Sequence, residues 1–446
     1  MKTPIFDFVE KYIQRSSVRA HMPAHKGRGK IGCECRDITE VDGADVLYHA
    51  DGIIRESERC ASRIFGTART LYSCEGSSLS IRAMLYLALV YAKKSGRDAR
   101  IVAPRNAHKA LLCACALLGI DIEWIYPCES DTITTCSISC DDIRGMLERT
   151  DACAVYLTSP DYLGNIADIE GISRVCRERG VLLLVDNAHG AYLHFLSRSR
   201  HPITLGADMC TDSAHKTLPV LTGGGYLHIS SKAPEICIDS ADSAMALFAS
   251  TSPSYLILQS LDLANAYMND GYGERLASLI CTLDNMKAHL TRAGYTLMGD
   301  EPLKLTVKSK SYGYTGDEIS DILRDGGVEC EFSDSDHLVL MLSTENTDEE
   351  LSRIERVLCS IPRRAEIIDT APKINKPKRV LSPREAMLSP SREVCVKDAV
   401  GKVLAQPSVS CPPAIPVLVC GEMVDESAVK CFEYYGITRC HIVDEA

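Results

Sequence analysis

A histidine–lysine pair behind a short apolar run is the feature of this sequence that most clearly indicates covalent chemistry. Lys216 directly follows His215, three residues after Ser213. Upstream, the apolar run 181–185 ends in Asp186. A lysine amine can form a Schiff base with an aldehyde, and a carboxylate can keep a pyridine nitrogen protonated. Lys216 and Asp186 together therefore predict a site for pyridoxal 5′-phosphate (PLP), in which both are catalytic and cofactor-binding residues.

A phosphate group needs hydrogen-bond donors, and two parts of the sequence offer them. Ser213 and His215 precede the lysine and can donate through their side chains. Ser77 and Ser78 follow Gly76 at the expected start of a helix, where backbone N–H groups favour an anion. A serine at such a place is more often a simple helix cap. All four residues are therefore candidates to bind the phosphate of the cofactor.

Two histidines have both a functional and a structural interpretation. His108 follows the strand-like run 100–103 and could stack on the cofactor ring, although a lone histidine near a helix start is more often structural. His189 lies three residues after Asp186 and could relay a proton or simply pack under the sheet edge. The sequence leaves both alternatives open for His108 and for His189.

Strand-like and helix-like runs alternate through the first half of the chain, which predicts an α/β protein with a mostly parallel sheet. In such sheets ligands bind at the carboxyl ends of strands, where Asp186 lies. The expected strands are 100–103, 122–126, 152–157, 181–185, 208–211 and 225–229, and the expected helices 79–92, 107–118, 141–148, 169–179 and 255–293. A smaller α/β layer is expected beyond residue 300, and a proline- and lysine-containing linker at 372–378.

Composition excludes several classes of protein. The net charge is −11 with no basic tract, which argues against nucleic acid as a partner. No apolar run reaches the roughly 20 residues that a membrane span requires, so we expect a cytoplasmic protein without membrane contact. The 21 cysteines are odd in number and form no C-x-x-C pair. They are expected to be reduced thiols that pack as small hydrophobes, and a zinc or iron–sulfur site is the minor alternative. No metal site is predicted.

With these residues laid out, the chain resembles the Orn/Lys/Arg decarboxylase family (group I) of the fold type I PLP-dependent enzymes. It is most similar to the short, Gram-positive-type members without an N-terminal wing domain. The resemblance spans nearly the whole chain and rests on segments 21–27, 37–40, 76–78, 105–109, 159–164, 186–190, 213–216, 411–416 and 421–422. The Ser-x-His-Lys element, with its partners in this order, is the most specific of these segments.

The resemblance implies a role for each matched residue. Lys216 would hold the cofactor as a Schiff base, Asp186 would pair with the pyridine nitrogen, and Ala188 would pack near the ring. His108 would stack on the ring, and Ser77, Ser78, Ser213 and His215 would bind the phosphate. The resemblance further implies a fold type I PLP-dependent transferase-like large domain with an N-terminal arm (1–280), a small α/β domain (281–371) and a C-terminal decarboxylase-type domain (379–446). The active sites would lie at a homodimer interface.

The implied activity is the decarboxylation of a basic amino acid to its amine, with arginine, lysine and ornithine left open. The sequence departs from the usual family pattern at Ala24, Ala414, Asn187 and Asp161, and near Gly223. Two alternatives therefore stay open. The first is a PLP-dependent aminotransferase or lyase on the same scaffold. The second is a catalytically idle PLP-binding protein, against which the presence of both Lys216 and Asp186 argues.

Overall fold

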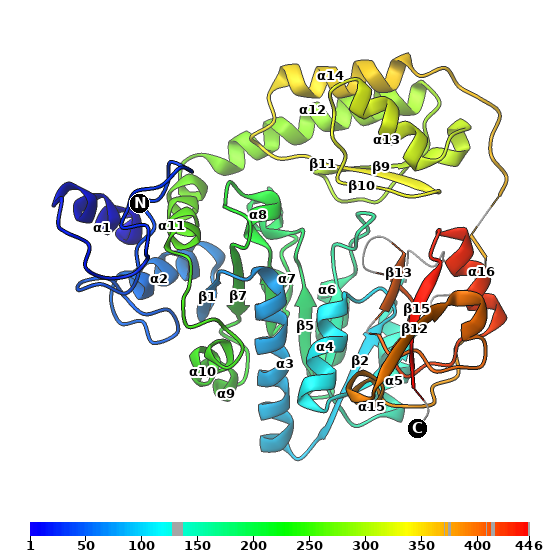
Figure 1. Cartoon of the computed structure of the whole chain (residues 1–446), viewed down its shortest axis with the longest axis horizontal. Helices are drawn as coiled ribbons and strands as arrows, with labels where there is room; N and C mark the ends of the chain where they lie inside the picture. The colour runs from blue at the N-terminus through cyan, green and yellow to red at the C-terminus, as the bar shows by residue number, and fades with distance from the viewer. Residues whose placement is uncertain (127–136, 370, 373–375, 407, 412–414, 445–446) are drawn as a thin grey trace. The chain divides into compact units, whose positions relative to one another are not determined.

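The computed structural model describes residues 1–126, 137–369, 371–372, 376–406, 408–411 and 415–444 (Figure 1). Part of the expected linker, 373–375, and part of the segment 411–416, residues 412–414, lie outside the described residues. Within the described part of the chain, no helix is long and apolar enough to cross a membrane.

A seven-stranded sheet forms the centre of the fold, in the order β1-β7-β6-β5-β4-β2-β3. Its strands are β1 (Arg69–Ser73), β2 (Asp98–Pro104), β3 (Asp121–Ile125), β4 (Ala152–Thr158), β5 (Leu182–Asp186), β6 (Met209–Asp212) and β7 (Gly225–Ile229). The pairs β2–β3 and β5–β6 are parallel, whereas β7 pairs antiparallel with both β6 and β1. The protein is thus α/β with a mostly parallel central sheet, as predicted.

The chain divides into two compact units, of which the first comprises Met1–Asp98, Cys153–Val155 and Ile169–Arg275. Helix α3 packs against β5, β6 and β7, and its side chains are mostly apolar where they meet the sheet. The helices of this unit are α1 (Pro4–Gln14), α2 (Ile53–Phe65), α3 (Gly76–Ser95), α6 (Ile169–Glu178), α7 (Pro202–Leu205), α8 (Ala214–Thr217), α9 (Glu235–Asp239), α10 (Ala241–Ala246), α11 (Tyr255–Asn269) and the 3₁₀ turn η1 (Ala191–Phe195).

The second unit comprises Ala99–Ala152, Tyr156–Asp168 and Leu276–Ala446. It contains a four-stranded sheet in the order β10-β11-β9-β8 and two two-stranded sheets, β12–β15 and β13–β14. These strands are β8 (Leu297–Met298), β9 (Lys304–Lys308), β10 (Phe332–Ser333), β11 (His337–Met341), β12 (Ser391–Cys395), β13 (Ser408–Cys411), β14 (Ile415–Val419) and β15 (Arg439–Val443). Its helices are α4 (Lys109–Leu118), α5 (Cys140–Arg149), α13 (Gly316–Asp325), α14 (Asp348–Ser360), α15 (Pro383–Leu388), α16 (Glu426–Tyr434) and the 3₁₀ turns η2 (Ser309–Tyr312) and η3 (Val396–Ala399).

All six strands expected from the sequence are present, each within two residues of its expected bounds. Three expected helices differ from the structure by two residues or more. The helix expected at 79–92 is α3, which is three residues longer at each end. The stretch 255–293 is two helices, α11 and α12 (Tyr272–Arg292), because the chain leaves the helix at Asp270. The helix expected at 107 begins at Lys109, because His108 caps it. The division into three domains stays a prediction.

Candidate active site

The residues expected to hold the cofactor ring lie at the ends of two neighbouring strands. Strand β5 ends at Asp186, and β6 ends at Asp212, directly before Ser213 and the short helix α8 that carries Lys216. The two strands are parallel, with Asp186 opposite Thr211. Their carboxyl ends therefore meet at one edge of the sheet, the edge where α/β proteins bind ligands.

Direct contacts join the lysine segment to the aspartate segment. The Lys216 Nζ lies 2.7 Å from the His189 Nε2. The backbone N–H of Ser213 donates to the Ala188 carbonyl at 3.3 Å. Of the two interpretations of His189, its contact with the lysine agrees with that of a proton relay, because an imidazole nitrogen and an amine at this distance can exchange a proton.

Asp186 is buried, with 2% of its surface exposed, and one of its carboxylate oxygens accepts a hydrogen bond from the Ala188 N–H at 3.2 Å. This local bond fixes the carboxylate against the turn that follows β5. Ala188 itself is half-buried, and its small side chain leaves room beside the carboxylate. The structure thus brings Asp186, Ala188, Ser213 and Lys216 together, as the sequence predicts.

The start of helix α3 has the features of a phosphate cradle. Its N-cap residue, Glu75, makes no side-chain cap, so no cap occupies the backbone N–H groups that follow Gly76 in the first turn. Ser77 and Ser78 stand in this first turn and are half-buried. Gly76 has a φ of +64°, and a Cβ placed on it would lie 3.7 Å from the His215 ring. His215 therefore approaches the start of α3, where a bound anion would meet both.

Hydrogen bonds from Gly76 and His215 fix the loop that contains Gly223 and Gly224 beside this cradle. The Gly76 N–H donates to the Gly223 carbonyl at 2.7 Å, and the His215 Nδ1 lies 2.8 Å from the Gly224 carbonyl. At Gly223 the φ is +99°, and a Cβ would lie 2.9 Å from the Cys74 carbonyl, so a larger residue does not fit. The arrangement fits the phosphate of PLP, and Ser77, Ser78, Ser213 and His215 are the side chains that could hold it.

His108 lies in the second unit and is the N-cap of helix α4. Its Nδ1 accepts a hydrogen bond from the Ala110 N–H at 3.2 Å, and the residue is half-buried. This capping bond is the structural role that a histidine at a helix start often has. Stacking of His108 on a cofactor ring stays a prediction.

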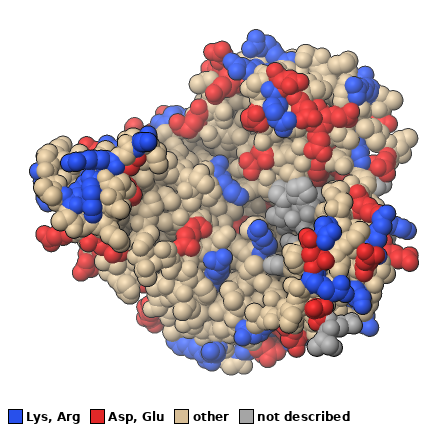
Figure 2. Space-filling model, viewed as in Figure 1, with Lys and Arg blue, Asp and Glu red and all other residues tan. Residues whose placement is uncertain are grey.

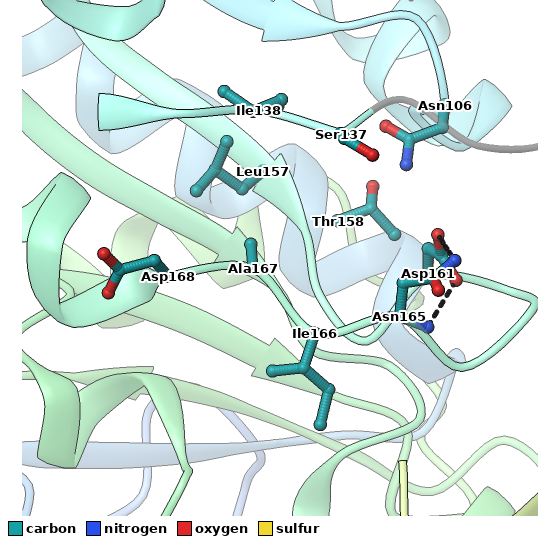
Figure 3. Close-up of a pocket in the computed structure, with 10 residues that line it drawn as sticks. All are labelled: Asn106, Ser137, Ile138, Leu157, Thr158, Asp161, Asn165, Ile166, Ala167 and Asp168. Atoms are coloured by element: carbon teal, nitrogen blue, oxygen red, sulfur yellow. Dashed lines mark hydrogen bonds between the residues drawn. The ribbon is translucent and has the colours of Figure 1, made fainter. Parts of the chain in front are cut away.

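The second unit also contains a pocket of about 160 Å³, drawn in Figure 3. It lies where β4 ends, and it includes Asn106 and Asp161 from the sequence segments named above. The Asn106 Oδ1 and the Thr158 Oγ1 are buried, and no hydrogen-bond partner for either is found among the described residues. Burial raises the pKa of Asp161, although its bonds to the Asn165 side chain and backbone act in the opposite direction. Among the ten described lining residues are two aspartates and no lysine, arginine or histidine, so the pocket suits a ligand rich in hydrogen-bond donors.

Sequence reasoning missed one buried carboxylate beside the site, Asp212. It ends β6 and is fully buried with two histidines, His201 and His228, against it. The only signal in the sequence is its place directly before Ser213. The histidines come from separate segments, so their approach to this carboxylate is visible only in the folded chain.

Cysteines and surface charge agree with the expectations for a reduced protein with an ordinary surface. Every cysteine whose side chain the structure describes is a free thiol, and many are buried. On the face drawn in Figure 2, acidic and basic side chains both occur, mainly toward the margins, and a broad area in the middle carries few charges. The expected absence of nucleic-acid binding stays a prediction.

Comparisons with known proteins give the family. A family model described as "Orn/Lys/Arg decarboxylase, major domain" matches residues 3–298. An arginine decarboxylase of Halalkalibacterium halodurans is 28% identical over 96% of this chain and 92% of its own length. An arginine decarboxylase of Bacillus subtilis is 26% identical over the same shares of the two chains.

Among solved structures, lysine decarboxylase A from Pseudomonas aeruginosa superposes with a TM-score of 0.80 at 15% identity. The match covers 99% of this chain and 80% of that one. The E. coli constitutive lysine decarboxylase gives a TM-score of 0.75 at 16% identity, covering 99% and 82% of the two chains. At such low identity these matches establish the fold.

Proposed function

The chain belongs to the Orn/Lys/Arg decarboxylase family, and from this premise we propose that it binds PLP at Lys216 and decarboxylates arginine in preference to other basic amino acids. Family membership makes it a PLP-dependent decarboxylase of a basic amino acid. Arginine is proposed because several of the full-length relatives carry the name arginine decarboxylase. The observation that carries the cofactor assignment is the contact of Lys216 with His189, three residues after Asp186.

Each residue of the first unit has a role that its geometry supports. When bound, PLP supplies an electron sink for the charge left by a departing carboxylate. Lys216 would hold the cofactor covalently, and Asp186 would keep a positive charge on the ring nitrogen. The uncapped start of α3, together with Ser77, Ser78, Ser213 and His215, would hold the phosphate.

His189 would move a proton to and from the Lys216 amine, because its Nε2 lies at hydrogen-bond distance from the Nζ. It is 5% exposed, so bulk water has little access to this side chain. In the second unit, His108 is proposed to present its ring to the cofactor, since its Nδ1 is engaged by the helix it caps. We further propose that the protein acts as a homodimer, which light scattering of the purified protein will test.

The decisive experiment measures carbon dioxide release by the purified, PLP-loaded protein from arginine, lysine and ornithine at equal concentration. We expect the highest kcat/KM with arginine and agmatine as the product. Reduction with borohydride should then fix the cofactor on one tryptic peptide, the one that contains Lys216. Labelling at Lys26 or Lys109 instead would overturn the assignment of the lysine.

The same experiment separates the alternative function. If no basic amino acid releases carbon dioxide, and an amino donor instead converts the bound cofactor to its amine form, the aminotransferase interpretation replaces this proposal. If PLP binds but neither reaction occurs, the protein is a binding protein that does not catalyse.

A further inference from the structure

Asp212 lies directly before the Ser213–Lys216 segment and has no contact with bulk water, because none of its surface is exposed. Its Oδ1 accepts a hydrogen bond from the Asn187 side-chain amide at 2.7 Å. Its Oδ2 lies 3.1 Å from the His201 Nε2 and 3.2 Å from the His228 Nε2. The Cys210 Sγ also lies 4.0 Å from its Oδ1, and among the described residues no lysine or arginine forms an ion pair with it.

The protons of this cluster can be assigned from its hydrogen bonds. An ionised carboxylate only accepts, so both Nε2 atoms carry a hydrogen and donate. The Nδ1 of His228 lies 2.9 Å from the Thr70 hydroxyl, which can donate to it, and a neutral imidazole satisfies both bonds. Burial lowers the pKa of His228, which keeps it neutral. Burial alone would raise the pKa of Asp212, but the two histidines hold it well below the ordinary range. Asp212 is therefore ionised in the folded protein.

This cluster joins the two segments that carry the proposed catalytic residues. Asn187 directly follows Asp186, and its backbone N–H donates to the Thr211 carbonyl at 2.9 Å. The side-chain bond to Asp212 is thus a second tie between the end of β5 and the end of β6. A buried carboxylate held by three donors has little freedom to move, so both strand ends are fixed relative to each other.

We propose that Asp212 is a positioning residue, which sets the Asp186 and Lys216 segments relative to each other and adds a fixed negative charge behind the lysine. This inference rests on the proposed function, because it assigns a role to Asp212 in the same site. A carboxylate near a protonated imine stabilises its charged form. A shift of about 1 Å in a catalytic group can lower a rate by roughly 10²-fold.

The test compares three variants with the wild-type holoenzyme. Asp212→Asn removes the charge, and Asn187→Ala removes only the tie to β5 and keeps both histidine bonds. Asp208→Asn is the matched control. Asp208 directly precedes β6, at the end opposite Asp212, and its carboxylate accepts a hydrogen bond from the Leu183 N–H of β5 at 2.8 Å. Four residues of extended chain place it about 13 Å from Asp212. The measurements are kcat, KM and the pH midpoint of the visible absorbance of the bound cofactor.

Asp212→Asn should lower kcat by about 10²-fold with KM nearly unchanged, and should move the absorbance midpoint to lower pH. Asn187→Ala should lower kcat less, and Asp208→Asn should leave kcat and the midpoint as in wild type. Wild-type kcat and midpoint in both Asp212→Asn and Asn187→Ala would overturn the proposal. If Asp212→Asn does not fold, the kcat and the absorbance midpoint of Asn187→Ala alone test the proposal.

Two further results separate this inference from its premise. If the wild type binds PLP but releases no carbon dioxide, the decarboxylase proposal fails and the absorbance midpoint still tests Asp212. If the wild type binds no PLP, both fail. Because the Cys210 Sγ lies 3.9 Å from the His201 Nε2, the zinc content of the purified protein is also measured. One zinc per chain, lost in Cys210→Ser, would make Asp212 a metal ligand and overturn the proposal.

Discussion

Two buried carboxylates, one in each unit, are stabilised in opposite ways. In the first unit, Asp212 accepts hydrogen bonds from an amide and two imidazoles and keeps its negative charge. In the second unit, Glu422 pairs with Arg105 through two bonds of 2.9 and 3.1 Å, and a third comes from the Val419 N–H. The Arg105 guanidinium also lies over the Trp124 ring, 5.1 Å from its centre. The charge of Glu422 is therefore neutralised where it is buried.

The difference follows from what each region has to do. A buried ion pair joins distant segments, and its geometry fixes which parts of the chain meet. Arg105 and Glu422 are separated by 317 positions, and their bond ties the end of β2 to the C-terminal segment. A charge left without a cation instead acts on its surroundings through low-dielectric protein. Asp212 lies beside the proposed cofactor site, where such a charge can favour a protonated group.

The largest expected effect tests whether the first unit carries the chemistry. Lys216→Ala should lower decarboxylation on the order of 10³-fold or more, because a covalent catalytic group is lost. Borohydride should then fix no cofactor, although phosphate contacts still allow PLP to bind. Lys93→Ala, at an exposed lysine in the last turn of α3, is the control and should behave as wild type. Substantial activity in Lys216→Ala would remove this site from the mechanism.

Breaking the ion pair of the second unit should act on stability. Glu422→Gln leaves the Arg105 charge buried without its partner, which costs about 3–5 kcal/mol of unfolding free energy. Urea unfolding followed by circular dichroism measures this loss. The double variant Arg105→Met with Glu422→Leu should recover most of it, since two apolar side chains replace the pair. A loss below about 1 kcal/mol in the single variant would mean that water enters and solvates the pair.

Asp186→Asn should act on the rate rather than on the fold. The amide can still accept the Ala188 N–H, so the melting temperature should change little. Loss of a fixed charge at the ring nitrogen should lower kcat by about 10²-fold. Activity near that of wild type, measured as carbon dioxide release, would show that Asp186 only caps the turn after β5.

A third buried carboxylate gives the smallest effect, and it depends on pH. Burial raises the pKa of Glu58 to about 7, although its bond from the Tyr72 N–H and the nearby Arg55 oppose the shift. The folded protein therefore holds this proton more tightly than the unfolded chain does. The contribution of protonated Glu58 to the unfolding free energy is fully present below about pH 4.5 and is lost as the pH rises through about 7.

Glu58→Gln should remove this pH dependence, because the neutral amide can accept the same bond without a charge. Between pH 4.5 and 7 the wild type should lose about 2 kcal/mol relative to the variant. Urea unfolding at each pH gives the comparison. The more exposed Glu56, on the same helix, provides the control variant Glu56→Gln. Parallel curves for the wild type and Glu58→Gln would show that Glu58 is ionised in the folded protein.

Much of the site was predictable because its residues are near neighbours in the chain. Ser213, His215 and Lys216 lie within one turn, and Ser77 and Ser78 start a helix whose apolar pattern is evident. Strand ends can be found from runs of apolar residues, and parallel pairing places Asp186 beside this segment. Local spacing and hydrophobic pattern suffice for such residues, since each is placed by the element that carries it.

Sequence patterns alone were enough to predict the α/β class, six strands of the central sheet and the residue types that fit PLP. The contacts of His189 with Lys216, of Asn187, His201 and His228 with Asp212, and of Arg105 with Glu422 arise only in the folded chain. A hydrogen bond requires its two atoms to lie within about 3 Å. Residues far apart in the chain reach that distance only when the strands and helices that carry them have packed.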